Sequence, residues 1–313
     1  MSLAVGVDLG RTKIAAGVVD EAGRILQETR RPTPTDSADA VVDAIVELVE
    51  ELRQQHPVTA VGVGAPCFIA HDRDYIMFTA NLPIRDVRMG SLIAERTGLP
   101  TVIENDANAA AWAEFTFGAG RGATDIVMIT LGTGIGGGIV TNGQLVRGAF
   151  GVAAEVGHIE VVPGGRRCGC GLLGCWEAHA SGSGFVQTAR ELAAERLSEA
   201  SILLSMGDGT AAGIEGVHVT EAARRGDVVA LAAFAAEGAL VGRGLAILGT
   251  ILDPSTYVIG GGLSDAADLF MDDLVRSYQD HISARAQRPP AQFKVAVMGN
   301  AAGIVGAADL ARQ

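Results

Sequence analysis

The sequence predicts an α/β protein of two domains, and three observations support this prediction. The chain has 313 residues, which is enough for two separate cores at about 150 residues per domain. A strand, a turn containing glycine and threonine, and a second strand occur twice, about 120 residues apart, which indicates a weak internal duplication. Apolar residues recur at helical spacing in the segments between and after these strands.

The composition of the chain limits the classes of protein to which it can belong. Hydrophobic residues make up 48% and charged residues 19% of the chain, which excludes disorder. The net charge of −12 counts against general nucleic-acid binding. No uncharged apolar run reaches the ~18 residues of a membrane span, and the best candidate, 239–252, is interrupted by Arg243. The N-terminus shows no secretion pattern, so we expect a cytoplasmic protein.

The first half alternates strands and helices. Asp36 or Ser37 would cap a helix whose apolar residues follow a helical period, Gly98 would end a second helix, and Pro32 and Pro34 close the opening three-stranded unit. Strands are predicted at 3–8, 13–19, 24–30, 58–64 and 101–104, and helices from 37 and at 91–96.

The second half repeats the opening pattern and ends in helices. Strands are predicted at 125–131, 135–141 and 144–146, with an Asn-Gly turn before the last, and another strand at 256–259. Helices are predicted at 108–115, 228–252 and 301–312. The apolar helix 228–252 is expected to be core rather than interface.

The segment Gly132–Gly138 contains five glycines in seven residues. Its G-x-G-x-x-G would suggest dinucleotide binding if a helix followed, but a strand follows, so we reject that interpretation. A phosphate-cradling hairpin is favoured over a merely flexible one, because a hydroxyl and several N–H groups at a tight turn suit phosphate oxygens. No Walker A sequence occurs.

The matching first turn is Gly10–Lys13. Asp8, at the end of a buried strand, is predicted to hold Mg²⁺ through water, and Thr12 and Lys13 to meet phosphate. By itself this segment is only weak evidence for phosphate binding, and the evidence becomes stronger when the segment is paired with the second glycine turn.

Three cysteines, Cys168, Cys170 and Cys175, fall within eight residues. A disulfide is disfavoured, and three closely spaced thiolates suit tetrahedral zinc with a histidine as the fourth ligand. His158 upstream and His179 downstream are both candidates for that ligand. Cys67 stands apart and is expected to be a small buried hydrophobe.

Polar residues cluster near these segments. Asn105 and Asp106 follow a predicted strand, and Glu155, His158 and Glu177 flank or precede the cysteines. Such carboxylates and amides suit a ligand with several hydroxyls. Asp106 faces a cleft or, with about equal weight, merely caps the following helix.

With these motifs in view, the chain resembles the ROK family of sugar kinases over nearly its whole length. The resemblance rests on segments 8–13, 104–109, 131–138, 155–158 and 168–177. It implies two actin-like ATPase (ribonuclease H-like) α/β domains around a central cleft. The small domain would comprise 1–107 plus about 300–313, and the large domain, with the zinc loop, 108–299.

The resemblance also implies residue roles in phosphorylation of glucose at its 6-hydroxyl, an entry step of glycolysis. Asp106 would be the general base, and the sugar ligands would be Asn105, Glu155, His158, Glu177 and Ala65. A structural zinc would be held by His158, Cys168, Cys170 and Cys175. ATP, with Mg²⁺, would be bound by Asp8, Gly10, Arg11, Thr12, Lys13, Gly132, Thr133, Gly134, Gly261 and Gly262. Arg11 departs from the family, which usually has glycine there.

Two alternatives to glucose phosphorylation remain at this stage. One is a kinase for fructose, mannose or an N-acyl hexosamine, because hydrogen-bonding residues indicate a sugar without saying which. The other is a ROK-type repressor, which is disfavoured because the first hairpin starts at Leu3, without room for a DNA-binding segment. We expect glucose and ATP as partners, no nucleic acid, no membrane, and a homodimer or homotetramer.

Overall fold

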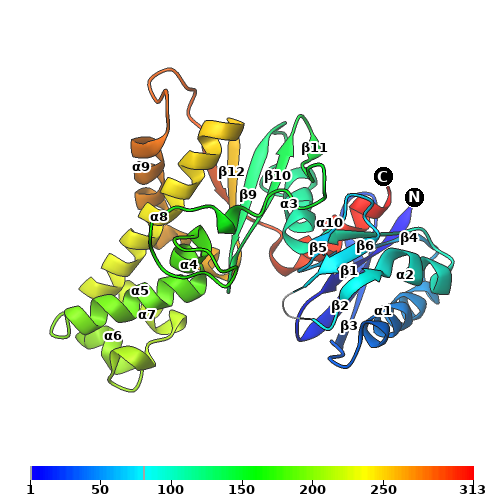
Figure 1. The fold of residues 1–313 in the computed structure, drawn as a ribbon, viewed down its shortest axis with the longest axis horizontal. Coiled ribbons are helices and arrows are strands. Elements are labelled where there is room, and N and C mark those ends of the chain that lie inside the picture. The colour runs from blue at the N-terminus through cyan, green and yellow to red at the C-terminus, as the bar shows by residue number, and fades with distance from the viewer. Residues whose placement is uncertain (1, 80–81) are drawn as a thin grey trace. The chain divides into compact units, whose positions relative to one another are not determined.

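A computed structural model describes residues 2–79 and 82–313 (Figure 1). The chain divides into two compact units. The first comprises Met1–Met128, Gly137–Ala154 and Ala296–Gln313, and the second Ile129–Gly136 and Glu155–Val295. The C-terminal residues thus lie in the same unit as the N-terminal ones, and the predicted boundary at residue 107 falls inside helix α3 (Asp106–Thr116).

The first unit is built on a five-stranded sheet of order β3-β2-β1-β4-β8. Strand β1 pairs antiparallel with β2 and parallel with β4, and β4 pairs parallel with β8. The bounds are β1 (Leu3–Leu9), β2 (Lys13–Val19), β3 (Ile25–Pro32), β4 (Val58–Ala65) and β8 (Thr101–Asn105). Sequence patterning predicted all five. Strands β1, β2, β4 and β8 are apolar runs, whereas β3 is largely polar and was predicted from the turn that precedes it.

Helices cover both faces of this sheet. Because side chains alternate along a strand, Val5 and Val7 face a core shared with α1 (Ala38–Arg53) and α2 (Met89–Thr97). Ala4 faces α10 (Ala302–Ala311) on the other side, where α3 also packs. That approach is close: a Cβ on Gly62 would lie 1.8 Å from the carbonyl oxygen of Ala307. Of the two candidate caps for α1, Ser37 is the one whose side chain accepts a backbone amide, that of Ala40.

A small sheet of order β5-β6-β7 was not predicted from the sequence. Its strands are β5 (Phe68–Ile69), β6 (Tyr75–Phe78) and β7 (Arg85–Arg88), and none is longer than four residues. Runs this short show too little alternation to be recognised in a sequence.

The second five-stranded sheet has the order β11-β10-β9-β12-β13. Both large sheets therefore order their strands, counted along the chain, as third, second, first, fourth and fifth, which is the topology that an internal duplication predicts. The bounds are β9 (Ile126–Leu131), β10 (Ile135–Thr141), β11 (Gln144–Leu145), β12 (Thr256–Gly260) and β13 (Gln292–Val295), the last of which was not predicted.

The second unit is mainly helical around α8 (Val228–Leu252), which packs against α4, α5, α7 and α9. Phe185, Phe234 and Phe270 form an aromatic cluster in its core, in which Phe234 stacks on Phe270 and is tilted against Phe185. The remaining helices are α4 (Trp176–Ala180), α5 (Gly182–Glu195), α6 (Ser201–Met206), α7 (Gly216–Arg224) and α9 (Met271–His281), with short 3₁₀ helices η1 (Val156–His158), η2 (Ala211–Gly213), η3 (Gly262–Leu269) and η4 (Gly299–Ala301).

Helix α8 requires a correction to the sequence-based expectation about membrane spans. By length and composition alone it is long and apolar enough to cross a membrane, despite Arg243. In the structure 56% of its most apolar window is buried and it packs against four other helices. A core helix passes the same test, so its apolar character is explained by its place at the centre of the second unit.

Candidate active site

The junction between β8 and α3 carries the predicted general base. The side chain of Asn105 caps α3, accepting hydrogen bonds from the amides of Ala107 and Asn108 at 2.9 and 3.1 Å. Asp106 is the first helical residue rather than the cap, so the alternative that it serves only as an N-cap is wrong. Its Oδ1 accepts one hydrogen bond, from the amide of Ala107 at 2.9 Å. Burial raises the pKa of Asp106. A carboxylate with a raised pKa is a stronger base, which suits a residue that must take a proton from a substrate.

Asp8 in β1 lies close enough to Asp106 for the two carboxylates to repel each other. Burial, and next the negative charge of Asp106, raise the pKa of Asp8 to about 6, while Lys13 acts in the opposite direction. Asp8 lies on the sheet face that meets α10, because a Cβ on Gly303 would come within 3.2 Å of its carboxyl carbon. Two partly buried carboxylates that repel each other form a place where a cation is favoured.

The first glycine turn follows Asp8 directly. The amide of Gly10 donates to the carbonyl of Lys13 at 3.0 Å, and the hydroxyl of Thr33 donates to the carbonyl of Gly10 at 2.7 Å. The side chains of Arg11, Thr12 and Lys13 are all exposed. This turn therefore presents a hydroxyl and two positive charges to solvent.

The second glycine turn, between β9 and β10, is held by the helices that follow it. The amide of Gly182 donates to the carbonyl of Gly132 at 2.7 Å, and the hydroxyl of Ser183 donates to that of Thr133 at 3.1 Å. The carboxylate of Glu177 accepts the amide of Ile135 at 3.0 Å. Gly134 makes this possible, since a Cβ there would lie 2.3 Å from the same carboxylate oxygen.

A cluster of metal-ligand atoms forms in the second unit. One ligand atom from each of His158, Cys168, Cys170 and Cys175 lies within 4.8 Å of the others. The Nδ1 of His158 is 3.6 Å from the Cys168 sulfur, and the Cys170 and Cys175 sulfurs are 3.6 Å apart. A tetrahedron with metal–sulfur bonds of about 2.3 Å has edges of about 3.8 Å, so the spacing fits zinc. Burial raises the pKa of the Cys175 thiol to about 12 without a cation.

The other histidine and the isolated cysteine have different surroundings. His179 is outside the cluster, and its Nε2 accepts the backbone amide of Arg166 at 2.9 Å. This agrees with the ligand set implied by the family resemblance. Cys67 is 5% exposed and packs in the core of the first unit, as predicted.

Of the predicted sugar ligands, Glu155, His158 and Glu177 group in the second unit. Glu155 Oε2 lies 4.0 Å from the Nε2 of His158, the ring nitrogen that faces away from the cysteines. Glu177 Oε1 is 3.7 Å from the Cys168 sulfur, so this carboxylate joins the cysteine cluster to the second glycine turn.

Asn105 and Ala65 belong to the first unit and pair with each other in the β4–β8 register. The side chain of Ala65 is fully buried in the core, which leaves its backbone as the part able to meet a ligand.

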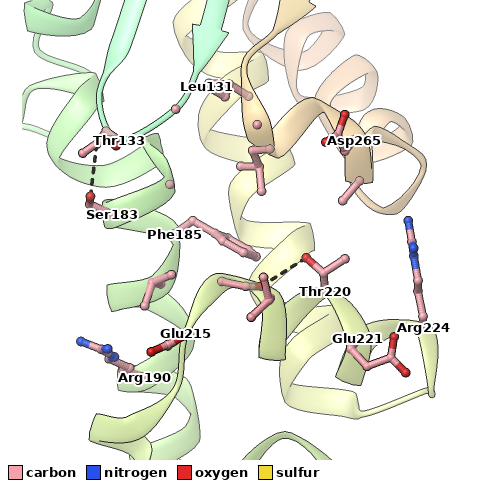
Figure 2. Close-up of a pocket in the computed structure, with 18 residues that line it drawn as sticks. Leu131, Thr133, Ser183, Phe185, Arg190, Glu215, Thr220, Glu221, Arg224 and Asp265 are labelled. Carbon is pink, nitrogen blue, oxygen red and sulfur yellow. Dashed lines mark hydrogen bonds between the residues drawn. The ribbon is translucent and has the colours of Figure 1, made fainter. Parts of the chain in front are cut away.

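A cavity of about 980 Å³ lies within the second unit, next to the second glycine turn (Figure 2). Gly132 and Thr133 form one edge with the N-terminus of α5, and Gly262 brings the predicted β12 turn to the same cavity. Sequence reasoning missed the rest of the lining, although the Ser-Gly-Ser-Gly run at 181–184 is a helix-start signal. The missed lining residues come from α5, α7 and η3 and from the segment before α7, and are Phe185, Val186, Arg190, Glu215, Gly216, Val217, Thr220, Glu221, Arg224, Leu263, Asp265 and Ala266.

Two sheets of the same strand order, each opening with a glycine-turn hairpin, define a member of the actin-like ATPase fold class. Within that class, the ROK family model matches residues 4–313, and the chain belongs to the ROK family.

Several relatives support this assignment. The chain is 49% identical to the glucokinase of Streptomyces coelicolor, over 100% of this chain and 98% of that protein. It is 32% identical to an N-acetylmannosamine kinase of Citrobacter koseri, over 98% of each. A crystal structure of a ROK family glucokinase from Streptomyces griseus in complex with glucose and AMPPNP matches with a TM-score of 0.85 and 49% identity, covering 100% of both chains.

Proposed function

We propose that this protein is a glucokinase that transfers the γ-phosphoryl group of ATP to the 6-hydroxyl of glucose. The observation that carries the proposal is Asp106, a partly buried carboxylate with a raised pKa at the start of α3. In the proposed reaction its carboxylate takes the proton of the 6-hydroxyl while that oxygen attacks the γ-phosphorus and ADP leaves. Such transfer depends mainly on positioning and charge neutralisation.

The nucleotide is assigned to the cavity of about 980 Å³ in the second unit. Thr133 offers a hydroxyl to phosphate oxygens, and the positive end of the α5 helix dipole, at the same edge of the cavity, favours anions. The nucleoside would lie against the apolar side chains of Val186, Val217 and Leu263. The AMPPNP complex of the Streptomyces griseus relative supports a nucleotide as the phosphoryl donor.

Two metals belong to the proposal, and the residues present fit both. Asp8 beside Asp106 supplies excess negative charge for Mg²⁺, which when bound neutralises phosphate charge. His158, Cys168, Cys170 and Cys175 form a four-ligand set for zinc, which fixes the loop structurally and leaves no open position for catalysis. The Nδ1 of His158 would serve the zinc, and its Nε2 then remains for a sugar hydroxyl.

Glucose is preferred over other hexoses on the strength of the comparisons. Identity to glucokinases is 49%, against 32% to an N-acetylmannosamine kinase. Coupled-assay rates on glucose, mannose, fructose and N-acetylmannosamine test this choice. A kcat/KM for any other hexose above that for glucose contradicts it. We further propose a cytoplasmic homodimer or homotetramer, which sedimentation and cell fractionation test.

The role of Asp106 is tested by Asp106→Asn. We expect kcat to fall by about 10²-fold or more, because the amide cannot take the proton, while glucose still binds. Coupled-assay kinetics measure kcat, and calorimetry measures glucose affinity. Asn105→Ala is a useful contrast, since it removes a helix cap and a proposed sugar ligand but leaves the carboxylate. Near-normal turnover in Asp106→Asn would sink the assignment.

A further inference from the structure

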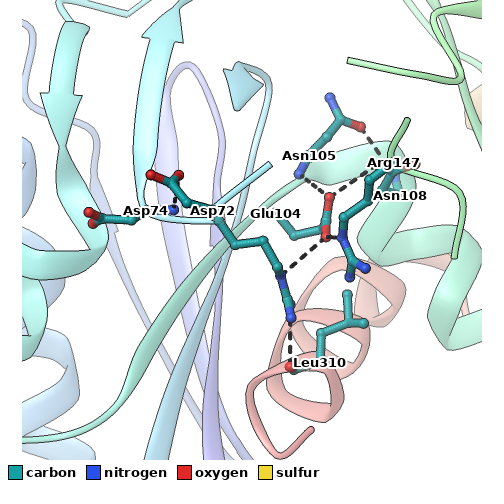
Figure 3. A network of polar contacts seen from close by, with 8 residues as sticks. Asp72, Asp74, Glu104, Asn105, Asn108, Arg147 and Leu310 are labelled. Atoms are coloured by element: carbon teal, nitrogen blue, oxygen red, sulfur yellow. Dashed lines mark hydrogen bonds and ion pairs between the residues drawn. The ribbon is translucent and has the colours of Figure 1, made fainter. Parts of the chain in front are cut away.

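A buried carboxylate lies two residues before the proposed base in the sequence. Glu104 is 4% exposed and stands at the end of β8, two residues before Asp106. Its Oε1 accepts the backbone amide of Asn105 at 3.1 Å and the side-chain amide of Asn108 at 3.0 Å (Figure 3). One carboxylate oxygen therefore fixes residues on both sides of Asp106.

Two arginines hold the other oxygen of this carboxylate. Arg147 Nε donates to Glu104 Oε2 at 2.6 Å, and Arg73 Nε lies 3.6 Å from the same oxygen. Arg73 also donates to the carbonyl of Leu310 in α10 at 3.3 Å, so the network reaches the C-terminal helix (Figure 3). All of these residues belong to the first unit.

Glu104 lies between two partly buried guanidinium groups, those of Arg73 and Arg147. Burial, followed by repulsion from Arg147, lowers the pKa of Arg73, and Glu104 opposes that shift. Arg147 Nη2 is buried without a hydrogen-bond partner among the described residues, so Glu104 carries the main compensation for its charge. Loss of the carboxylate would leave two partly buried guanidinium groups facing each other.

The geometry links this network to the orientation of Asp106. Asn105 caps α3 through its side chain and meets Glu104 through its backbone, and Asn108 completes the first turn of the helix. A shift of the Glu104 carboxylate therefore turns the start of α3, and Asp106 with it. Phosphoryl transfer is sensitive to such shifts, since a 1 Å misplacement can lower a rate by about 10²-fold.

We infer that Glu104 is a positioning residue for Asp106 and that Arg147 holds Glu104 in its working orientation through their ion pair. This inference rests on the proposed function, because it assumes that Asp106 is the base. Glu104 acts through Asp106 and touches neither sugar nor nucleotide.

A double-mutant cycle tests the inference. Glu104→Gln keeps shape but removes the charge, and we expect kcat to fall about 10–100-fold with the KM for ATP unchanged. If Glu104 acts through Asp106, the same substitution in an Asp106→Asn background changes kcat by less than about 3-fold. Independent, multiplying losses in the double variant overturn the inference. Near-normal turnover of Asp106→Asn alone overturns the proposed function instead, which separates the two failures.

Arg147 supplies a second test that does not depend on Glu104→Gln folding. Arg147→Met should lower kcat about as much as Glu104→Gln, and Arg147→Lys should recover part of the loss because the charge remains. Asp74→Asn is the matched control, because Asp74 is a partly buried carboxylate of the same unit that binds Arg88 and Ser91 instead. Its kcat should stay within about 2-fold of the unmodified protein. An unchanged kcat in Arg147→Met overturns the role of Arg147.

Discussion

In the first glycine turn the amide of Gly10 donates to the carbonyl of Lys13, and in the second the amide of Gly132 donates to that of Gly134, both at 3.0 Å. Their surroundings differ. The first turn exposes two cationic side chains and follows Asp8, whereas the second has no charged side chain and is held by α5 and Glu177. The two turns thus close differently, over three residues in the first and over two in the second. The first turn is held by Thr33 and presents charges to solvent, whereas the second is uncharged and is held by neighbouring helices.

The largest effect is expected from Gly134→Ala in the second turn. A Cβ there would lie 2.3 Å from Glu177 Oε2, so the carboxylate must move and release the amide of Ile135. We expect kcat/KM for glucose to fall about 10²-fold or more. Gly169→Ala is the control, because no atom lies within 4 Å of a Cβ there. Equal activity of the two variants would show that the Glu177 contact does not matter.

The next effect concerns Asp8, beside the first turn, where Asp8→Asn should lower kcat about 10²-fold by removing the proposed Mg²⁺ contact. The same change should stabilise the fold. The pKa of Asp8 is raised to about 6 from 3.8, mainly by burial and then by Asp106, so the folded state binds this proton more tightly than the unfolded state. The ionised carboxylate therefore destabilises the fold above pH 6, and the penalty disappears below about pH 4.

Urea unfolding without nucleotide, sugar or Mg²⁺ measures this pH dependence. Asp8→Asn should be more stable by about 1–3 kcal/mol at pH 7.5, with the gain shrinking as the pH falls from 6 to 4. Asp125→Asn is the control, because hydrogen bonds, first from Thr124, lower the pKa of Asp125. It should bring no stabilisation at pH 7.5. A gain for Asp8→Asn that does not change with pH contradicts the explanation.

A smaller effect should follow from removal of the metal. Cys170→Ser removes one of the four clustered ligands and should reduce zinc content, measured by mass spectrometry, and lower kcat/KM for glucose about 10-fold. Because Glu177 joins Cys168 to Ile135, amide exchange should quicken at 132–135 and stay unchanged at 10–13. Cys67→Ala, which lies outside the cluster, should keep its zinc. Equal exchange changes in both turns would refute the link through Glu177.

The elements that the sequence predicted depend on local signals. Each hairpin, each glycine turn and helix 228–252 lies within one continuous stretch of sequence. Three of the four clustered ligands are cysteines close together in the sequence, so their spacing alone predicted a metal site. Whether Asp106 caps the following helix or faces a cleft was not predictable, because aspartate commonly caps helices and the answer depends on where β8 ends.

Other parts of the site depend on distant pairs. Glu104 meets Arg147 across 43 positions of sequence, and no local pattern marks such a pair. The cavity wall from α7 was missed for the same reason, since it forms only when α5 and α7 pack together. The sequence could identify the residue types of the candidate site, whereas their partners depend on packing.

The smallest effect is expected at Arg11, where the ROK family usually has glycine. The backbone of Arg11 does not adopt a positive φ, so the turn does not require glycine there. The exposed side chain takes no part in the hydrogen bonds of Gly10. Arg11→Gly should therefore change kcat less than about 3-fold, and any rise in the KM for ATP should disappear at high salt, as expected for a screened surface charge. Lys13→Met, compared at both salt concentrations, is the matched control for the second cation of this turn. A loss of kcat in Arg11→Gly that persists at high salt would mean that Arg11 shapes the turn, and that its side chain does more there than supply charge.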